Sequence, residues 1–168
     1  MKNAFAIRRH IQRIAMIVES LPATVDPETS PHPTLATTEQ PLRVLVVDDG
    51  RNAADILALF FEIEGHEVGV AYDGLEAVER AEVLKPQLIL MDIGMPKLNG
   101  LEAARRIRSQ NGGEKIVIVA LSGLDQDDDK RQCAEAGFDD HLAKPVEPNE
   151  LRVIVDRYRS RFAPASAG

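Results

Sequence analysis

Residues 87–100 read QLILMDIGMPKLNG, an apolar run that ends in one acid and is followed by a loop rich in turn-forming residues. Four consecutive large apolar residues stand directly before Asp92. A short, wholly apolar run of this kind predicts a strand at residues 87–91 that is buried on both faces. A basic helix is expected over residues 99–110. The stretch therefore predicts a strand, a loop and a helix, with Asp92 at the carboxyl end of the strand.

The same alternation extends in both directions from this stretch. Further strands are predicted at residues 42–47, 67–71, 115–121 and 139–143, and helices at residues 52–64, from Asp73, at 125–136 and from Pro148. Gly65 ends the first of these helices, and Asp73 with Glu76 predicts a capping box at the start of the next. Five β–α units require crossover connections, so the strands pair in parallel. We expect a doubly wound α/β sheet with helices on both faces.

Composition narrows the class of protein. Hydrophobic residues form 44% of the 168-residue chain and aromatic residues only 4%, which predicts an aliphatic core. The net charge of −7 argues against a protein that binds nucleic acid through a basic surface. Cys133 is the single cysteine, so no intramolecular disulfide can form, as is typical of the reducing cytoplasm. No apolar run approaches the roughly 20 residues that span a bilayer.

The chain divides into four zones by composition. Residues 1–21 form a basic amphipathic pattern, residues 22–41 a Pro/Thr-rich linker, residues 42–162 the α/β domain, and residues 163–168 a loose tail. In the first zone apolar residues follow a 4-3-4-3 spacing that is typical of a coiled-coil seam: Ile7, Ile11, Ile14, Val18 and Leu21. Three interpretations stay open for this segment. It pairs with a copy of itself or a partner helix, it packs on its own domain, or it is a basic tail; membrane contact is disfavoured.

Polar residues stand where the predicted strands end. Asp48 and Asp49 follow the first strand, Asp92 the third, Ser122 the fourth and Lys144 the fifth. The carboxyl ends of parallel strands meet at one edge, where open α/β sheets bind their ligands. Three carboxylates gathered there would repel one another unless a cation neutralises them, and oxygen ligands suit Mg²⁺. Each residue alone has an ordinary structural explanation as a cap, a turn or a solvated side chain. The combination indicates a site.

The motifs together resemble the receiver domains of two-component response regulators, over about residues 42–160. The similarity rests on VVDD at 46–49, MDIGMP at 91–96 followed by NG at 99–100, ALSG at 120–123, AGFD at 136–139 and KP at 144–145. The resemblance implies a flavodoxin-like fold with strand order 2-1-3-4-5. It also implies a function, in which a sensor histidine kinase or a histidine phosphotransfer protein donates a phosphoryl group to an aspartate.

The resemblance assigns a role to each matching residue. Asp92 matches the phosphoacceptor, and Asp48 and Asp49 match the acidic pair that holds Mg²⁺ (or Mn²⁺) together with Asp92 and the backbone carbonyl of Gly94. Ser122 matches the hydroxyl that acts in both catalysis and switching, and Lys144 matches the lysine that contacts the phosphoryl group. His141 matches a switch position that is often Tyr or Phe in the family, so an aromatic rotamer switch of the usual kind is in doubt here.

These implications lead to a cytoplasmic signalling switch of a phosphorelay as the expected function. The 168-residue chain leaves no room for a DNA-binding output domain, so the output is expected to be a protein contact. Catalysis would be limited to phosphorylation and dephosphorylation of the protein itself. Two alternatives stay open: a scaffold that only resembles a receiver, and an aspartyl-nucleophile phosphatase. The phosphatase is disfavoured because the acids of the first strand are adjacent instead of separated by one residue.

Overall fold

A computed structural model describes residues 41–123 and 127–162 of the chain. The predicted N-terminal helix at 1–21 and tail at 163–168 lie outside the described residues, as does the predicted linker at 22–41 except for Pro41. In chain order the elements are β1 (Arg43–Val47), α2 (Arg51–Ile63), β2 (Glu67–Ala71), α3 (Gly74–Leu84), β3 (Leu88–Asp92), α4 (Gly100–Arg108), the 3-10 turn η1 (Gly113–Lys115), β4 (Val117–Ser122), α5 (Asp127–Ala136), β5 (Asp140–Ala143), α6 (Pro148–Arg157) and α7 (Arg159–Phe162).

The five strands form one parallel sheet with the order β2-β1-β3-β4-β5, which confirms the predicted fold class. β1 and β3 lie side by side at the centre, with Val47 paired to Met91 in the register. The order reverses at β1, because the chain first adds β2 on one side and then β3 on the other. The carboxyl ends of β1 and β3 therefore lie next to each other at the switch point, where such sheets bind ligands.

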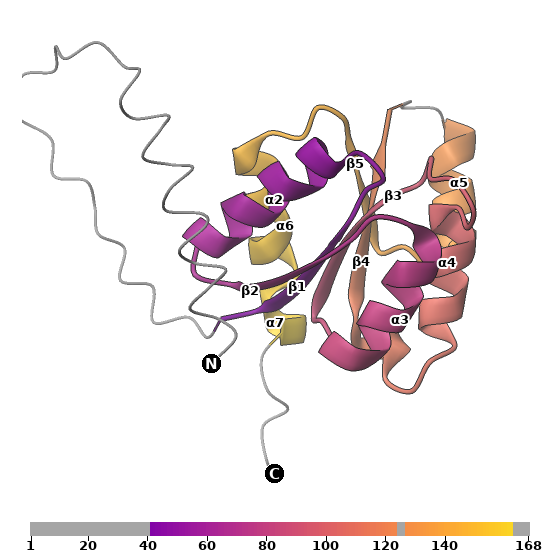
Figure 1. Cartoon of the computed structure of the whole chain (residues 1–168), viewed down its shortest axis with the longest axis horizontal. Coiled ribbons are helices and arrows are strands. Elements are labelled where there is room, and N and C mark those ends of the chain that lie inside the picture. The colour runs from indigo at the N-terminus through magenta and orange to yellow at the C-terminus, as the bar shows by residue number, and fades with distance from the viewer. Residues whose placement is uncertain (1–40, 124–126, 163–168) are drawn as a thin grey trace, which may run out of the picture. The chain divides into compact units, whose positions relative to one another are not determined.

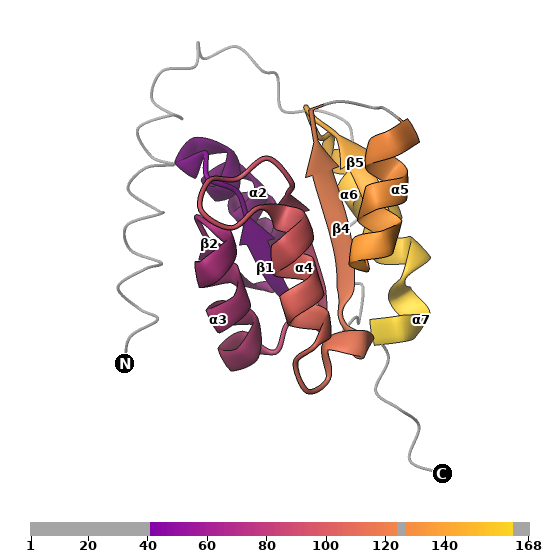
Figure 2. The same cartoon turned by 90° about the vertical axis from the view of Figure 1, so that its right-hand side faces the viewer.

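Helices cover both faces of the sheet, and each face has its own apolar core (Figure 1). On one face α3, α4 and α5 pack over alternate residues of the central strands such as Leu45, Ile89 and Ile118. On the other face α2 and α6 pack over Val44, Leu90 and Val119 (Figure 2). β1, β3 and β4 are buried on both faces, which explains their continuous apolar sequences. This rigid centre holds the strand ends in fixed positions.

The helix starts differ in one respect from the prediction. Asp73 caps α3 by accepting a hydrogen bond from the Glu76 backbone N–H, as expected, but the Glu76 carboxylate accepts from the N–H of Tyr72 instead of Asp73. The predicted capping box is thus wrong in its second bond, which reaches one residue further back. A reciprocal capping box does form at α6, between Glu147 and Glu150.

Strand and helix boundaries shift from the predictions by one to three residues. The predicted start of the fourth strand at residue 115 is wrong, because residues 113–115 form the turn η1 after Gly112, whose φ is 86°. The last helix also ends earlier than its apolar pattern indicates, at Arg157, and a separate short turn, α7, follows. Among the described residues, no helix is long and apolar enough to cross a bilayer.

Candidate functional site

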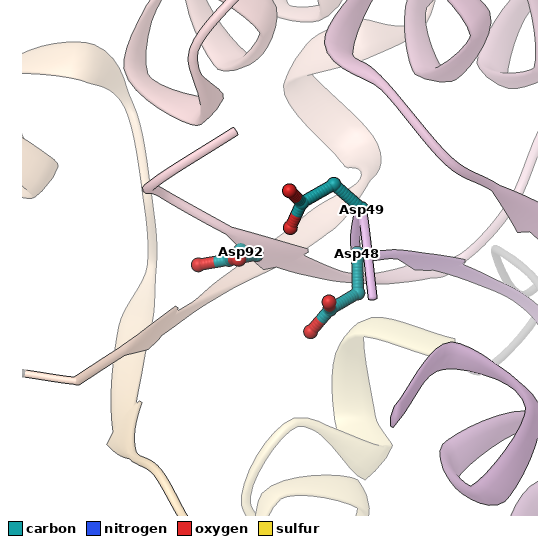
Figure 3. Close-up of side chains that lie close together, drawn as sticks. All are labelled: Asp48, Asp49 and Asp92. Atoms are coloured by element: carbon teal, nitrogen blue, oxygen red, sulfur yellow. The ribbon is translucent and has the colours of Figure 1, made fainter. Parts of the chain in front are cut away.

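Three carboxylates gather at the carboxyl edge of the sheet. Asp48 and Asp49 follow β1, and Asp92 is the last residue of β3, so adjacent strands deliver all three (Figure 3). One carboxylate oxygen from each lies within 4.8 Å of the others. Asp48 and Asp92 are buried, at 2% and 9% relative exposure, whereas Asp49 is exposed. Ionised groups are rarely placed this way unless a partner or ligand compensates them.

Backbone N–H groups orient the two buried acids. Asp48 accepts a hydrogen bond from the Gly50 N–H at 2.8 Å, and Asp92 accepts one from the Gly94 N–H at 3.1 Å. In each case the Oδ1 atom accepts from the residue two positions later, which is a local turn geometry typical of aspartate. These bonds fix the side-chain rotamers and direct the Oδ2 atoms to the middle of the group.

Lys144 occupies that middle position. Its ammonium Nζ lies 2.7 Å from Asp48 Oδ2 and 3.0 Å from Asp92 Oδ2. Partial burial alone would lower the pKa of Lys144, but hydrogen bonds to Asp48 and Asp92 outweigh this and raise it above its ordinary value. Lys144 therefore carries its positive charge at neutral pH. One ammonium cannot balance three carboxylates, so the group holds a formal surplus of negative charge.

Ser122 ends the neighbouring strand β4 and is also buried, at 8% exposure. It follows Leu121, the residue that pairs with Asp92 in the sheet register. Its carbonyl accepts a hydrogen bond from the Lys144 backbone N–H at 2.8 Å, which joins the ends of β4 and β5. Asp48, Asp92 and Ser122 are the buried polar or charged side chains of the described residues, and all three come from this one edge.

The loop behind Asp92 depends on close backbone approaches that the sequence analysis did not assign. A Cβ atom at Gly100 would stand 2.3 Å from the Asp92 carbonyl oxygen, so only glycine fits where α4 begins. Lys97 in the same loop bonds the Asp73 carboxylate at 2.6 Å and so ties the loop to the start of α3. The Glu76 N–H and then Lys97 lower the pKa of Asp73. Asn99-Gly100 was visible in the sequence, but the contact that requires glycine is tertiary.

The remaining predicted site residues take two different positions. Gly94 lies two residues after Asp92 in the loop and is exposed, so its backbone can face a ligand. His141 pairs with Ala120 inside the sheet, two residues before the strand end marked by Ser122. Since Leu142 packs with the core under α2 and α6, the alternating side chain of His141 points to the opposite face. The three acids and Lys144 are therefore grouped, and His141 stands back from the group.

The donor set fits a hard divalent cation. Carboxylate oxygens from Asp48, Asp49 and Asp92 are close enough to share one ion, and all are hard oxygen ligands. A divalent cation would balance the negative charge that Lys144 leaves uncompensated. Mg²⁺ commonly takes one to a few protein carboxylates and keeps several waters, which suits a group with one exposed member.

Comparison with known sequences identifies the class of protein. The sequence model of the response regulator receiver domain matches residues 44–156. The chain belongs to this family, and it is a receiver domain of the two-component signalling type. A 14.6 kDa protein from the sodA1 3′ region of Leptolyngbya boryana is 36% identical over 121 residues, which cover 72% of this chain and 92% of that protein.

The alkaline phosphatase synthesis transcriptional regulatory protein PhoP of Bacillus subtilis is 37% identical over 127 residues, 74% of this chain and 52% of PhoP. The chain thus spans about half the length of this regulator, and of several DNA-binding regulators that match similarly. What those whole proteins do is not carried over with the shared domain.

Solved structures agree with this assignment. The receiver domain of the sensor histidine kinase PA1611 from Pseudomonas aeruginosa is 33% identical, with a TM-score of 0.67 over 72% of this chain and 99% of that one. That crystal structure holds a magnesium ion in its active-site cleft. The chemotaxis response regulator CheY4 of Vibrio cholerae is 27% identical, with a TM-score of 0.67 over 70% of this chain and 98% of that one.

Proposed function

We propose that this protein is a phosphorylation switch of a phosphorelay, in which Asp92 accepts a phosphoryl group. The observation that carries the proposal is the shared Lys144 ammonium between the buried carboxylates of Asp48 and Asp92, with Asp49 beside them. This arrangement combines a carboxylate nucleophile, a positive charge and a surplus of negative charge suited to a divalent cation at one sheet edge.

In the proposed reaction an oxygen of Asp92 attacks the phosphorus atom of a phosphohistidine on a sensor histidine kinase or phosphotransfer protein. The O–P bond forms while the P–N bond breaks, and its electron pair stays with the departing imidazole. Attack of water on the same phosphorus later releases inorganic phosphate and restores the carboxylate. The protein thus acts on its own aspartate and is not a conventional turnover enzyme.

Each neighbouring residue has a defined part in this proposal. The Gly94 N–H, which bonds one oxygen of Asp92, keeps the other oxygen directed into the group. Lys144 transfers its hydrogen bonds from the carboxylates to a phosphoryl oxygen, and the Ser122 hydroxyl donates to another. Asp48, Asp49, Asp92 and the Gly94 carbonyl would hold Mg²⁺ or Mn²⁺. When bound, the ion supplies positive charge that offsets the charge gathering on the transferred group.

The output proposed for the switch is a contact with another protein, made in the cytoplasm, instead of binding to nucleic acid. Phosphorylation adds about −1.5 to −2 units of charge to the site. Bonds from Ser122 and Lys144 to the phosphoryl group would favour one of two pre-existing conformers. The net charge of −7 and the single cysteine support the absence of nucleic-acid binding and the cytoplasmic location. His141 lies on the strand between these residues and is the proposed relay to the reading surface.

The test is intact mass spectrometry after incubation with a small phosphodonor. The wild type should gain one phosphoryl group in the presence of Mg²⁺ and none after chelation, and Asp92→Asn should gain none. A protein that binds Mg²⁺ but never gains mass has an adduct too short-lived to detect, which a stopped-flow measurement of donor consumption would reveal. A protein that neither binds Mg²⁺ nor consumes donor is a scaffold, and sustained release of phosphate from unrelated phosphomonoesters would indicate a phosphatase.

A further inference from the structure

The outer side of α2 carries an apolar stripe that the core does not use. Ala54, Ala58 and Phe61 bury the inner side of this helix. On the outer side Ile56 and Ile63 are 69% and 71% exposed, and Leu59 between them is half-buried and lies outside both apolar cores. Residues 56, 59 and 63 follow a 3-4 spacing, so they line one side of the helix. We call Ile56, Leu59 and Ile63 the α2 stripe. Contiguous exposed apolar residues of this kind mark contact surfaces.

We propose that the α2 stripe is the docking site of residues 7–21 of the same chain. Those residues carry their own apolar line with 4-3-4-3 spacing, the seam Ile7, Ile11, Ile14, Val18 and Leu21. Two helices whose apolar residues repeat at alternating intervals of three and four pack along their length, because each side chain fits between four of the other helix. The seam and the α2 stripe have the same periodicity and are both apolar.

The attachment point of the segment favours docking within one chain. Leu42, just before β1, bonds the far end of α2: its N–H donates to His66 Nδ1 at 3.3 Å, and its carbonyl accepts from the Glu67 N–H at 2.8 Å. These bonds lie within four residues of Ile63. The tether therefore begins beside one end of the stripe. Residues 22–41 reach at most about 70 Å, and the 13-residue helix α2 is only about 20 Å long.

Charge supports the same occupant. The segment around the seam is basic, with Lys2, Arg8, Arg9 and Arg13. Acidic residues flank the α2 stripe: Glu62 and Glu64 stand on either side of Ile63, and Asp55 precedes Ile56. A tethered segment also meets its site at an effective concentration near the millimolar range, which an untethered second copy reaches only in concentrated solution.

Docking along α2 would place the segment beside the acidic group. α2 begins at Arg51, two residues after Asp49. A helix lying along the outer side of α2 would narrow the approach of a large protein to Asp92 and leave small molecules free to enter. The segment would then act as a cover that a partner must displace.

Disulfide trapping in the full-length chain tests the contact directly. Every variant carries Cys133→Ala, because the native thiol is buried and must not compete. Ile14→Cys is combined with Ile56→Cys or with Ile63→Cys. The matched control combines Ile14→Cys with Val83→Cys, since Val83 on α3 is an equally apolar residue, 87% exposed, on a helix that covers the other face of the sheet. Intrachain disulfides should form at least about tenfold faster in a test pair than in the control.

Two outcomes would overturn the proposal: equal rates in test and control pairs, or disulfides that link two chains and rise with protein concentration, which assign the stripe to a second copy. Hydrogen exchange of the α2 amides gives a second reading without new cysteines. Exchange should speed up in Ile11→Asp with Val18→Asp, and stay as in the wild type in the charge-matched Gln12→Asp with Ser20→Asp. Unchanged exchange in the seam variant would also overturn the proposal, because the stripe is then covered by a different partner or by none.

Discussion

The two ends of the sheet use polar residues in opposite ways. At the carboxyl end, Asp48, Asp49 and Asp92 face one another with Lys144 between two of them, so like charges are concentrated. At the amino end, Arg108 donates to the carbonyls of Gly113, Ile116 and Gly137 and to the Asp139 carboxylate, so one cation satisfies four acceptors. The amino end is balanced within the protein, whereas the carboxyl end is incomplete without a ligand.

Concavity does not distinguish the two ends in the same way. A hollow of about 420 Å³ lies at the amino end, lined among others by Arg43, Lys85, Lys115 and Arg161. Arg43 and Arg161 there bond backbone carbonyls or acids, and the lysines stand near the carboxyl ends of helices, where positive charge is ordinarily stabilising. Unbalanced buried charge is therefore a better guide to the functional site than the presence of a hollow.

The largest expected effect compares a glycine at each end. A Cβ atom would stand 2.3 Å from the Asp92 carbonyl oxygen at Gly100 and 2.1 Å from the Ile107 carbonyl oxygen at Gly113. Gly100→Ala and Gly113→Ala should each lower the free energy of unfolding by about 3 kcal/mol, because backbone must move. Gly94→Ala is the matched control, since its Cβ would meet only Asp92 Oδ1 at 3.9 Å. Urea unfolding measures all three.

The same pair of glycine variants also separates the two ends functionally. The folded fraction of Gly113→Ala should still take up a phosphoryl group, whereas that of Gly100→Ala should not, because its substituent displaces Asp92. Equal loss of uptake in both variants would show that the two ends are not independent.

The next effect compares the two cations. Arg108→Met should cost about 2–3 kcal/mol of stability, because several partly buried acceptors lose their donor at once, and it should leave phosphoryl uptake intact. Lys144→Met should cost about 1 kcal/mol in chelator and nearly nothing in saturating Mg²⁺, because the ion would replace the lost positive charge, while phosphoryl uptake falls about 100-fold. Thermal unfolding with and without Mg²⁺ checks this. Comparable stability losses for both variants in Mg²⁺ would contradict the comparison.

Magnesium binding should give a smaller shift. At ten times its dissociation constant, Mg²⁺ should stabilise the wild type by about 1.4 kcal/mol and raise Tm by about 4 °C. Asp49→Asn should reduce or abolish the shift. Asp55→Asn is the control, because Asp55 is an exposed acid of α2 that bonds the Tyr72 hydroxyl. An equal shift in all three proteins would place the ion somewhere else.

The smallest effect is a pH dependence at His66, beside the entry to β1. Burial lowers the pKa of His66 below its ordinary value of 6.5, although Glu64 opposes this, and Nδ1 accepts a hydrogen bond from the Leu42 N–H. Below pH 6.5 the unfolded chain then binds the proton more readily, so stability should fall with pH until the folded state also protonates. Unfolding at pH 7.5 and 5.5 should show a smaller difference in His66→Gln than in the wild type. The same difference in both would exclude His66 as the cause.

The sequence was most informative where burial repeats along the chain. The strand at Glu67–Ala71 and the buried run before Asp92 were predicted because β-branched and aliphatic runs on both sides of turn residues have few other solutions. The clustering of Asp48, Asp49 and Asp92 followed from parallel topology alone. Their chemical roles, and that of His141, stay predictions until phosphorylation is measured.

The features that the sequence could not show depend on contacts between distant residues. Arg108 reads as an ordinary basic residue in the last turn of α4, but its partners lie up to 31 residues away. Gly100 reads as a helix start, and its need for glycine comes from the Asp92 carbonyl across the loop. The bond from Glu76 to Tyr72, instead of Asp73, depends on how the chain leaves β2.

The most direct test of the central claim, that the unbalanced carboxyl end accepts a phosphoryl group, is to locate that group by peptide mass spectrometry. Wild-type protein is treated with a small phosphodonor and Mg²⁺, quenched and digested. The account predicts the added mass on Asp92 alone, and no added mass in Asp92→Asn. An adduct on another residue of the wild type, or one that persists in Asp92→Asn, would contradict the account.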